Sequence, residues 1–453
     1  MINFLITKRV LNLKGIKLSL KRALTFWQAT MFGIGLILGA GIYVVIGRTA
    51  AYAESSVWLS VFIAGLIAFM TGLSYAELSG MYPKASSSYY YIKRAIPHRE
   101  IIAFLVGWMI FFEAASGAAT AAVGFAYYFT ELLPSLKFMG RVTTVISALI
   151  LVALMSTVNW WGIEESSTLN VIFTLIELSG LILVITIGFA YGTLSPNYLS
   201  LPSRGFLGIL QGSALIFFAY VGFELMATTS EETLKASVVM PRAILAALFT
   251  CSMVYLLVSL AVVRLLPWRE LAISEAPLAL AVERAIGSWG WYVLALIALF
   301  ATSNTVLGFL VSSSRMAYGM AVDRMLHFKL SEVHQKRGTP HYAVILAGLV
   351  AAFEILVAGL TDVKIIDIVA KSSNLGCLIA FIFVNMSVVI LRFKEKGIKR
   401  PFRIPGELFG VPVMPLLGSI MCFIVIVLTF HELIVWLITL AVLALGMIFK
   451  KFG

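Results

Sequence analysis

Long apolar runs follow one another along almost the whole chain and leave few possible folds. Each run is about 20 residues long, which is the length a helix needs to cross the hydrocarbon core of a bilayer. The runs lack the polar–apolar alternation of half-buried strands, and lipid permits only helices or closed barrels as spanning structures. Sixty per cent of the 453 residues are hydrophobic and 12% are charged. The sequence therefore predicts an all-α membrane protein.

We predict twelve membrane-spanning helices. The first 23 residues are basic but have no signal-peptide pattern, so we expect residues 1–23 to form a cytoplasmic tail on the membrane surface. The predicted spans lie near 24–53, 57–81, 101–133, 142–160, 168–193, 206–228, 243–266, 289–315, 342–360, 366–391, 411–429 and 432–449.

Basic residues are distributed unevenly between the two ends of these spans. With the N-terminus inside, 25 of the 34 lysines and arginines fall on the cytoplasmic side. This bias predicts a multi-pass cell-membrane protein with both termini in the cytoplasm. The net charge of +12 then reflects topology, with anionic lipids as the expected neighbours, and we expect no nucleic-acid partner.

Two of the predicted helices carry features that weaken a helix at its middle. Span 1 reads MFGIGLILGAGIYVVIGRT over 31–49, with Gly39, Ala40 and Gly41 at its centre. Each interior glycine weakens a helix by roughly 0.5–1 kcal/mol relative to alanine. Span 6 contains FFAYVGFE over 217–224. Spans 1 and 6 hold corresponding positions in two five-helix halves, 24–193 and 206–391, and such paired interruptions point to the binding site of a transporter.

The predicted breaks have complementary chemistry. Unwinding at residues 39–41 exposes backbone N–H groups at the positive end of a half-helix, where a carboxylate can bind. Carbonyls freed at 217–219 suit an ammonium group, so a zwitterion would satisfy both breaks. The alternative is that these glycines only allow close helix packing, and the sequence leaves it open.

Several further strings occur in the order found in one transporter group. The chain resembles the amino acid–polyamine–organocation superfamily of permeases, close to its cationic amino acid transporter branch. The strings are GAGI (39–42), YAELSGMYPKASSSYYYIKRA (75–95), FFAYVGFE (217–224), MPRAI (240–244), SSSRMAYGMAVDRML (312–326), NLGCLIAF (374–381) and FRIPG (402–406).

The resemblance implies a secondary transporter that imports amino acids by alternating access. It implies a five-plus-five inverted-repeat core, with 411–449 forming two peripheral helices and Phe218 closing over the substrate from outside. The sequence departs from the family at Ser86-Ser87, where Gly-Gly is usual, and at Glu177, where proton-coupled relatives often carry lysine. The implied substrate contacts are Gly39, Ala40, Gly41, Ile42, Phe217, Phe218, Ala219, Tyr220, Val221 and Gly222.

Three acidic residues fall inside the predicted core spans. Glu113, Glu177 and Glu224 each cost at least about 2.5–3.5 kcal/mol at the bilayer centre, and burial there favours the protonated form. We hypothesise that Glu177 takes and releases the driving proton, with Glu113 as its neighbour. The alternative is a permanently protonated Glu177 that bonds to Ser303 or Thr305 in span 8.

Other coupling modes and functions stay open. An ionised Glu177 near oxygen ligands would suit Na⁺, and passive exchange of cationic amino acids or polyamines is a further alternative. A channel or a non-transporting sensor or scaffold is more remote. We expect no enzyme, metal or cofactor, because Cys251, Cys377 and Cys422 are scattered in apolar runs and the five histidines lie at loops or span ends. Glu354 in span 9 is expected to make a helix–helix hydrogen bond or an oligomer contact.

Overall fold

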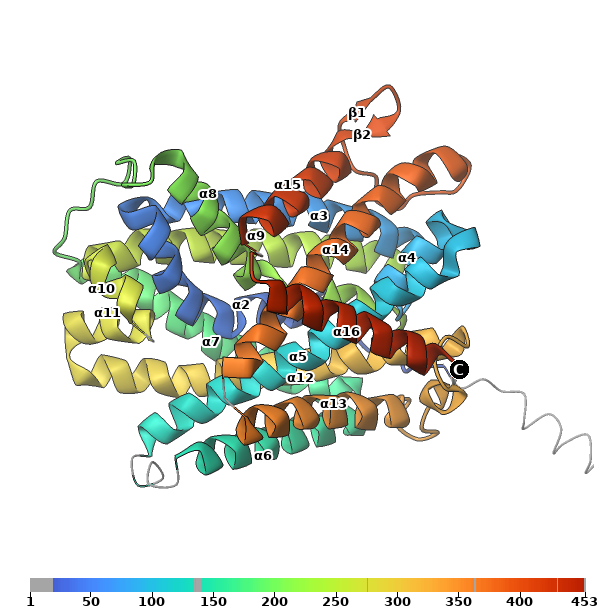
Figure 1. The fold of residues 1–453 in the computed structure, drawn as a ribbon, viewed down its shortest axis with the longest axis horizontal. Helices are drawn as coiled ribbons and strands as arrows, with labels where there is room; N and C mark the ends of the chain where they lie inside the picture. Colours follow the sequence, from blue (N-terminus) through green and yellow to red (C-terminus); the bar gives the residue numbers. More distant parts are fainter. Residues whose placement is uncertain are drawn as a thin grey trace, which may run out of the picture.

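The structure is a computed structural model that describes residues 19–451 except 134, 136–139, 275, 362–363 and 430. The described chain is almost entirely helical, with one short hairpin of two strands (Figure 1). Most of the predicted tail, 1–18, lies outside the described residues.

The long helices agree with the predicted spans. Eleven segments of the described chain are long and apolar enough to cross a membrane, while α15 is shorter at 17 residues. One of the eleven is the interrupted segment Gly205–Glu232. The other long helices and the shorter α15 are α2 (Phe26–Ala53), α3 (Val57–Met81), α5 (Glu100–Leu132), α6 (Arg141–Trp161), α7 (Ile163–Tyr191), α9 (Ala236–Leu265), α12 (Ser288–Val322), α13 (His341–Leu360), α14 (Lys364–Lys394), α15 (Val413–Thr429) and α16 (Leu433–Lys450).

The predicted sixth span consists of three pieces, and short elements connect the other helices. The pieces are α8 (Gly205–Ile216), η4 (Phe217–Tyr220) and η5 (Leu225–Glu232). The connecting elements are η1 (Glu54–Ser56), α4 (Ser87–Ala95), η2 (Pro97–Arg99), α10 (Trp268–Ile273), α11 (Pro277–Ile286), η6 (Phe328–Ser331), β1 (Glu407–Leu408) and β2 (Val411–Pro412).

Helix α2 starts at a capping box. Thr25 accepts a hydrogen bond from the Gln28 N–H, and the Gln28 side chain accepts one from the Thr25 N–H. This reciprocal pair satisfies two backbone donors that the first helical turn leaves free. The cap fixes where the first span begins.

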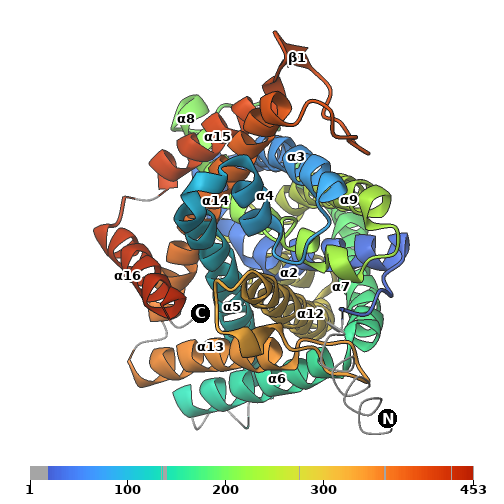
Figure 2. The same ribbon diagram turned by 90° about the vertical axis from the view of Figure 1, so that its right-hand side faces the viewer.

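Helix α2 lies near the middle of the bundle (Figure 2). It packs against α9, α7 and α12, while α5 packs along α12 and α14. Helices α15 and α16 lie at the edge, as the resemblance implies, and α13 packs against α6 on another side. The inverted-repeat relation between the two halves stays a prediction.

Buried ion pairs connect the helices at one end of the bundle. Glu77 pairs with Arg392 and Arg400, and Glu232 at the end of η5 pairs with Arg315 at 2.9 Å. Removing one partner from such a pair leaves an uncompensated buried charge. These pairs therefore hold the ends of α3, η5, α12 and α14 in fixed relation.

The serine pair that departs from the family pattern is also buried. Ser87 has φ +24°, at the edge of the backbone region that favours glycine. Ser86 packs tightly against Gly319, where an added Cβ would lie 2.5 Å from the Ser86 nitrogen. Ser87 therefore has a glycine-like backbone, while Ser86 has an ordinary negative φ and approaches α12 closely.

Candidate functional site

Both predicted breaks are present in the backbone. Gly39 inside α2 has φ +20° and ψ −170°, which no α-helix contains. In the sixth span, η4 ends at Tyr220, Val221 is extended, and Gly222 has φ +126°. The chain then resumes as η5. Each interruption leaves polar backbone groups in the middle of the bundle.

The two breaks lie against each other. A Cβ added at Gly41 would lie 3.0 Å from the Ala219 Cα, and one added at Gly222 would lie 2.8 Å from the Leu36 carbonyl oxygen. Gly222 also has a backbone conformation that residues with a side chain rarely adopt. Glycine is therefore required at Gly222 for two independent reasons.

One tyrosine hydroxyl joins the two interrupted helices. Tyr255 on α9 places its hydroxyl oxygen 2.6 Å from the Ile37 carbonyl oxygen, 3.0 Å from that of Leu38 and 3.1 Å from that of Ala219. The hydroxyl has one hydrogen and donates to one of these carbonyls at a time. Tyr255 therefore satisfies part of the backbone that the breaks set free.

A cavity of about 220 Å³ lies beside the breaks. Its volume corresponds to about seven water molecules at ~30 Å³ each, which is the size range of a single amino acid. The wall combines α2, α5, the sixth span, α12 and α14. The lining residues are Leu36, Ile37, Gly39, Gly41, Val45, Glu113, Gly117, Thr120, Ala121, Phe218, Ala219, Val221, Thr305, Phe309, Ala370, Ser373 and Asn374.

Some of the predicted contacts lie behind this wall instead of on it. Ile42, Phe217 and Tyr220 are fully buried and do not line the cavity. Phe217 and Tyr220 belong to η4, a helical turn of which only one face meets the cavity, and Ile42 lies on a face of α2 that does not meet it. Gly222 also lies behind the wall, and of Ala40 only the backbone is described.

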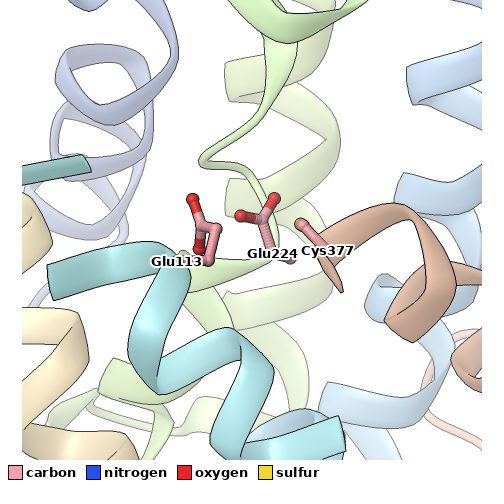
Figure 3. Close-up of side chains that lie close together, drawn as sticks. All are labelled: Glu113, Glu224 and Cys377. Carbon is pink, nitrogen blue, oxygen red and sulfur yellow. The ribbon is translucent and has the colours of Figure 1, made fainter. Parts of the chain in front are cut away.

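Glu113, Glu224 and Cys377 converge at the edge of the cavity (Figure 3). One ligand atom from each lies within 4.8 Å of the others, and all three residues are buried. Glu224 accepts hydrogen bonds from the Gly222 N–H at 3.0 and 3.1 Å, whereas one oxygen of Glu113 has no partner in the described part of the chain. The neighbour predicted for Glu113 is Glu177, whereas its neighbour in the structure is Glu224.

Two carboxylates this close repel each other when both are ionised. Their oxygens lie within 4.8 Å of each other, so at an effective dielectric constant of 20 the repulsion is at least about 3.5 kcal/mol, and burial adds a desolvation cost for each charge. One proton shared between Glu113 and Glu224 removes most of this cost. The neighbouring thiol is a soft ligand that suits neither Na⁺ nor Mg²⁺, so the cluster is better suited to a proton than to a hard cation.

Glu177 lies at a separate position on α7. Its side chain is fully buried and lies near the Asn304 amide, but neither carboxylate oxygen forms a hydrogen bond of ordinary geometry with the described residues. The expected partners lie elsewhere: Ser303 donates to the Leu299 carbonyl at 2.7 Å, and Thr305 donates to the Ala301 carbonyl at 3.0 Å. Hydroxyls in a helix commonly bond back to the preceding turn, which removes them as donors to Glu177.

A polar cluster near Glu177 was missed by the sequence analysis. Asn170 donates to the Asn304 side chain at 2.7 Å, and Asn304 donates to Thr174 at 2.9 Å. This chain of amides joins α7 to α12 where Gly35 of α2 packs against it. An asparagine inside an apolar span is the signal that could have indicated it.

One of the two roles predicted for Glu354 on α13, a helix–helix hydrogen bond, is confirmed. Its carboxylate accepts a hydrogen bond of 2.9 Å from Ser116 on α5. Ser116 is one residue before Gly117, which lines the cavity. The isolated acid of α13 therefore makes a helix–helix hydrogen bond outside the cavity.

Comparisons with known proteins agree with this geometry. The family described as "Amino acid permease" matches residues 24–448. The branched-chain amino acid permease BcaP of Bacillus subtilis is 28% identical over 439 residues, covering 93% of this chain and 91% of its own length. The methylthioribose transporter of the same organism is 28% identical over 417 residues, covering 89% and 87%.

Cationic amino acid transporter 4 of Mus musculus is 30% identical over 397 residues, which cover 83% of this chain and 61% of the mouse protein. Together with the family match over nearly the whole length, these relatives confirm the resemblance found in the sequence. The chain belongs to the amino acid permease family of the amino acid–polyamine–organocation superfamily, and it is a transporter and not an enzyme.

Proposed function

We propose that the protein imports amino acids across the cell membrane by proton-coupled alternating access. The observation that carries the proposal is the cavity of about 220 Å³ between the two helix breaks. Polar backbone at this depth is tolerated only where it lines a cavity or is buried in protein. A zwitterionic guest offers the charges that both breaks would bind.

The proposed pose follows from the chemistry of the breaks. The substrate carboxylate binds N–H groups at the start of the outer half of α2, near Gly41, and the ammonium group binds carbonyls of η4 near Phe218. The side chain then points toward α5, whose residues Gly117, Thr120 and Ala121 line the cavity. We expect both termini to lie in the cytoplasm, on the basis of the charge bias.

Glu177 is the proposed carrier of the coupling proton. It is buried with the Asn304 amide as its polar neighbour and with no ion pair among the described residues, and α7 packs against both α2 and α12. A proton that neutralises Glu177 would remove an unpaired charge from this junction and lower the cost of moving α2 relative to α12. Glu113 and Glu224 provide a second place for a proton at the cavity itself.

The test uses purified protein in liposomes with a pH gradient, acidic outside, and radiolabelled leucine, valine, lysine and arginine. We expect Glu177→Gln to lose gradient-driven accumulation and to keep counterflow exchange, which needs no net proton movement. Glu354→Gln is the matched control, because it removes a membrane acid outside the cavity. If accumulation is unchanged in Glu177→Gln, the proton role of Glu177 is contradicted. If accumulation requires Na⁺, the sodium alternative is favoured. If no substrate flux occurs at all, a sensor or scaffold is favoured.

A preference for cationic substrates is supported by one specific contact. Glu113 lines the cavity and has an oxygen without a partner among the described residues. A basic side chain could take the place of the shared proton between Glu113 and Glu224. We expect Glu113→Gln to reduce lysine and arginine uptake more than leucine uptake; equal reductions would contradict this preference.

A further inference from the structure

The hairpin between α14 and α15 has an unusual turn. Leu408 pairs with Val411, so the turn consists of Phe409 and Gly410. Both have positive φ, +51° and +78°, which is the geometry of a type I′ turn. Asparagine, aspartate and glycine are favoured at the first of these positions, whereas an aromatic residue there is an outlier. A strained residue on a surface turn calls for a functional explanation.

The same phenylalanine is exposed on the outside of the bundle. Phe409 is 95% exposed and Leu408 is 61% exposed. Figures 1 and 2 show the hairpin projecting beyond the edge of the helices, beside α15. Strand β2 leads directly into α15 at Val413, so about 7 Å of strand separates the tip from a membrane helix. Because α15 is predicted to cross the membrane, this short distance places the apolar tip near the lipid interface.

A basic pocket of about 470 Å³ adjoins the hairpin. Four cationic side chains line the pocket. Two carboxylates partly offset their charge: Glu407 lies in the pocket wall and Glu77 lies behind it. The four cations are Arg392, Lys396, Arg400 and Arg403, and Phe409 of the hairpin tip lines the same pocket.

The carboxylates leave part of this positive charge unpaired. Arg403 forms hydrogen bonds of 2.7 to 3.0 Å with Glu407, and they hold the pKa of Glu407 below its ordinary value. Arg392 contacts both acids, yet its buried Nε has no partner in the described part of the chain. Lys396 is exposed and has no ion pair within the described residues. The pocket can therefore accept an anion.

We propose that this pocket binds the phosphate of an anionic phospholipid while Phe409 and Leu408 enter the acyl region of the same leaflet. Guanidinium groups bind phosphate through paired charge-assisted hydrogen bonds, and basic side chains near a membrane surface attract anionic lipid. A soluble phosphate would use the pocket but would leave the apolar tip in water. The strained, exposed Phe409 beside the cations therefore favours a lipid over a soluble anion.

The first experiment locates the tip. Phe409→Cys in the full chain is labelled with an environment-sensitive fluorophore, since Cys251, Cys377 and Cys422 are buried. Gly397→Cys is the matched control, because a side chain there meets open space. In phosphatidylcholine–phosphatidylglycerol liposomes, we expect brominated acyl chains to quench the label at 409 and not at 397. The proposal would be overturned by a label at 409 that stays in water. It would also be overturned by a label that is shielded from water but not quenched, since a second copy of the protein would then cover the tip.

The second experiment tests the pocket by native mass spectrometry of retained lipid. Lys396→Gln is expected to weaken phosphatidylglycerol binding about fivefold relative to phosphatidylcholine, the effect of one interfacial charge. Lys399→Gln removes an exposed lysine of the same loop that does not line the pocket, and we expect it to leave binding unchanged. Equal effects of the two variants would refute the site. If soluble glycerol phosphate displaces bound phosphatidylglycerol as strongly as added lipid does, the pocket is a soluble-anion site instead.

Discussion

Replacing Tyr255 by phenylalanine removes one oxygen atom from the point where the two interrupted helices meet. The hydroxyl lies within 3.1 Å of three backbone carbonyls, two from α2 and one from η4. Phenylalanine keeps the ring and its packing. The variant therefore tests whether this hydrogen bond holds the breaks in the geometry that forms the cavity.

The expected magnitude follows from the number of bonds lost. The hydroxyl donates one hydrogen, so the change removes one hydrogen bond and leaves a buried carbonyl unsatisfied, at a cost of about 1–3 kcal/mol. Without the tyrosine, the broken segments sample other arrangements, and substrate binding must order them again. A cost of this size corresponds to a rise in Kd of about 5- to 150-fold.

The assay is equilibrium binding of a radiolabelled amino acid to purified protein in lipid nanodiscs. Tyr220→Phe is the matched control: its ring lies 5.2 Å from that of Tyr255, but its hydroxyl donates to Val61 in the continuous helix α3. We expect the control to change Kd by less than about twofold, because that carbonyl keeps its helical bond. Unchanged affinity in Tyr255→Phe, or an equal loss in Tyr220→Phe, would refute the reasoning.

Two further substitutions test the breaks and the ion pairs. Gly222→Ala should abolish uptake into liposomes, because φ is +126° and the new Cβ would lie 2.8 Å from the Leu36 carbonyl oxygen; Gly124→Ala, whose nearest neighbour would be 3.7 Å away, should retain it. Arg315→Met should lower the free energy of unfolding by about 3–5 kcal/mol, since it leaves Glu232 buried and unpaired. In thermal unfolding, adding Glu232→Leu to that variant should recover much of the loss, and no recovery would argue against the ion-pair explanation.

The helices themselves could be predicted because lipid imposes a simple rule. An apolar run long enough to cross the bilayer must satisfy its own backbone, so the predicted span 289–315 lies within α12 (Ser288–Val322). The breaks at Gly39 and Gly222 could also be predicted, because glycine in an otherwise apolar helix leaves a local mark in the sequence. Both signals depend only on neighbouring residues.

The partners of the buried acids could not be predicted in the same way. The core helices are apolar on most sides, so no periodicity shows which face of α5 or α14 points inward. Glu113 was therefore assigned to Glu177 although its neighbour is Glu224. Cys377, one of three cysteines scattered in apolar runs, lies beside both acids of that pair. Tyr255 left no sequence signal, since one tyrosine in an apolar span is also common at a lipid interface.

Hydrophobic length and glycine content act locally, so the residues alone indicate that the chain spans a membrane, where its helices run and which two of them are interrupted. The packing of the helices sets which side chains meet at the interruptions: the Tyr255 hydroxyl on three carbonyls, and Glu113 against Glu224. The rotation of each helix about its own axis sets those contacts, and that rotation is fixed by packing against several helices at once.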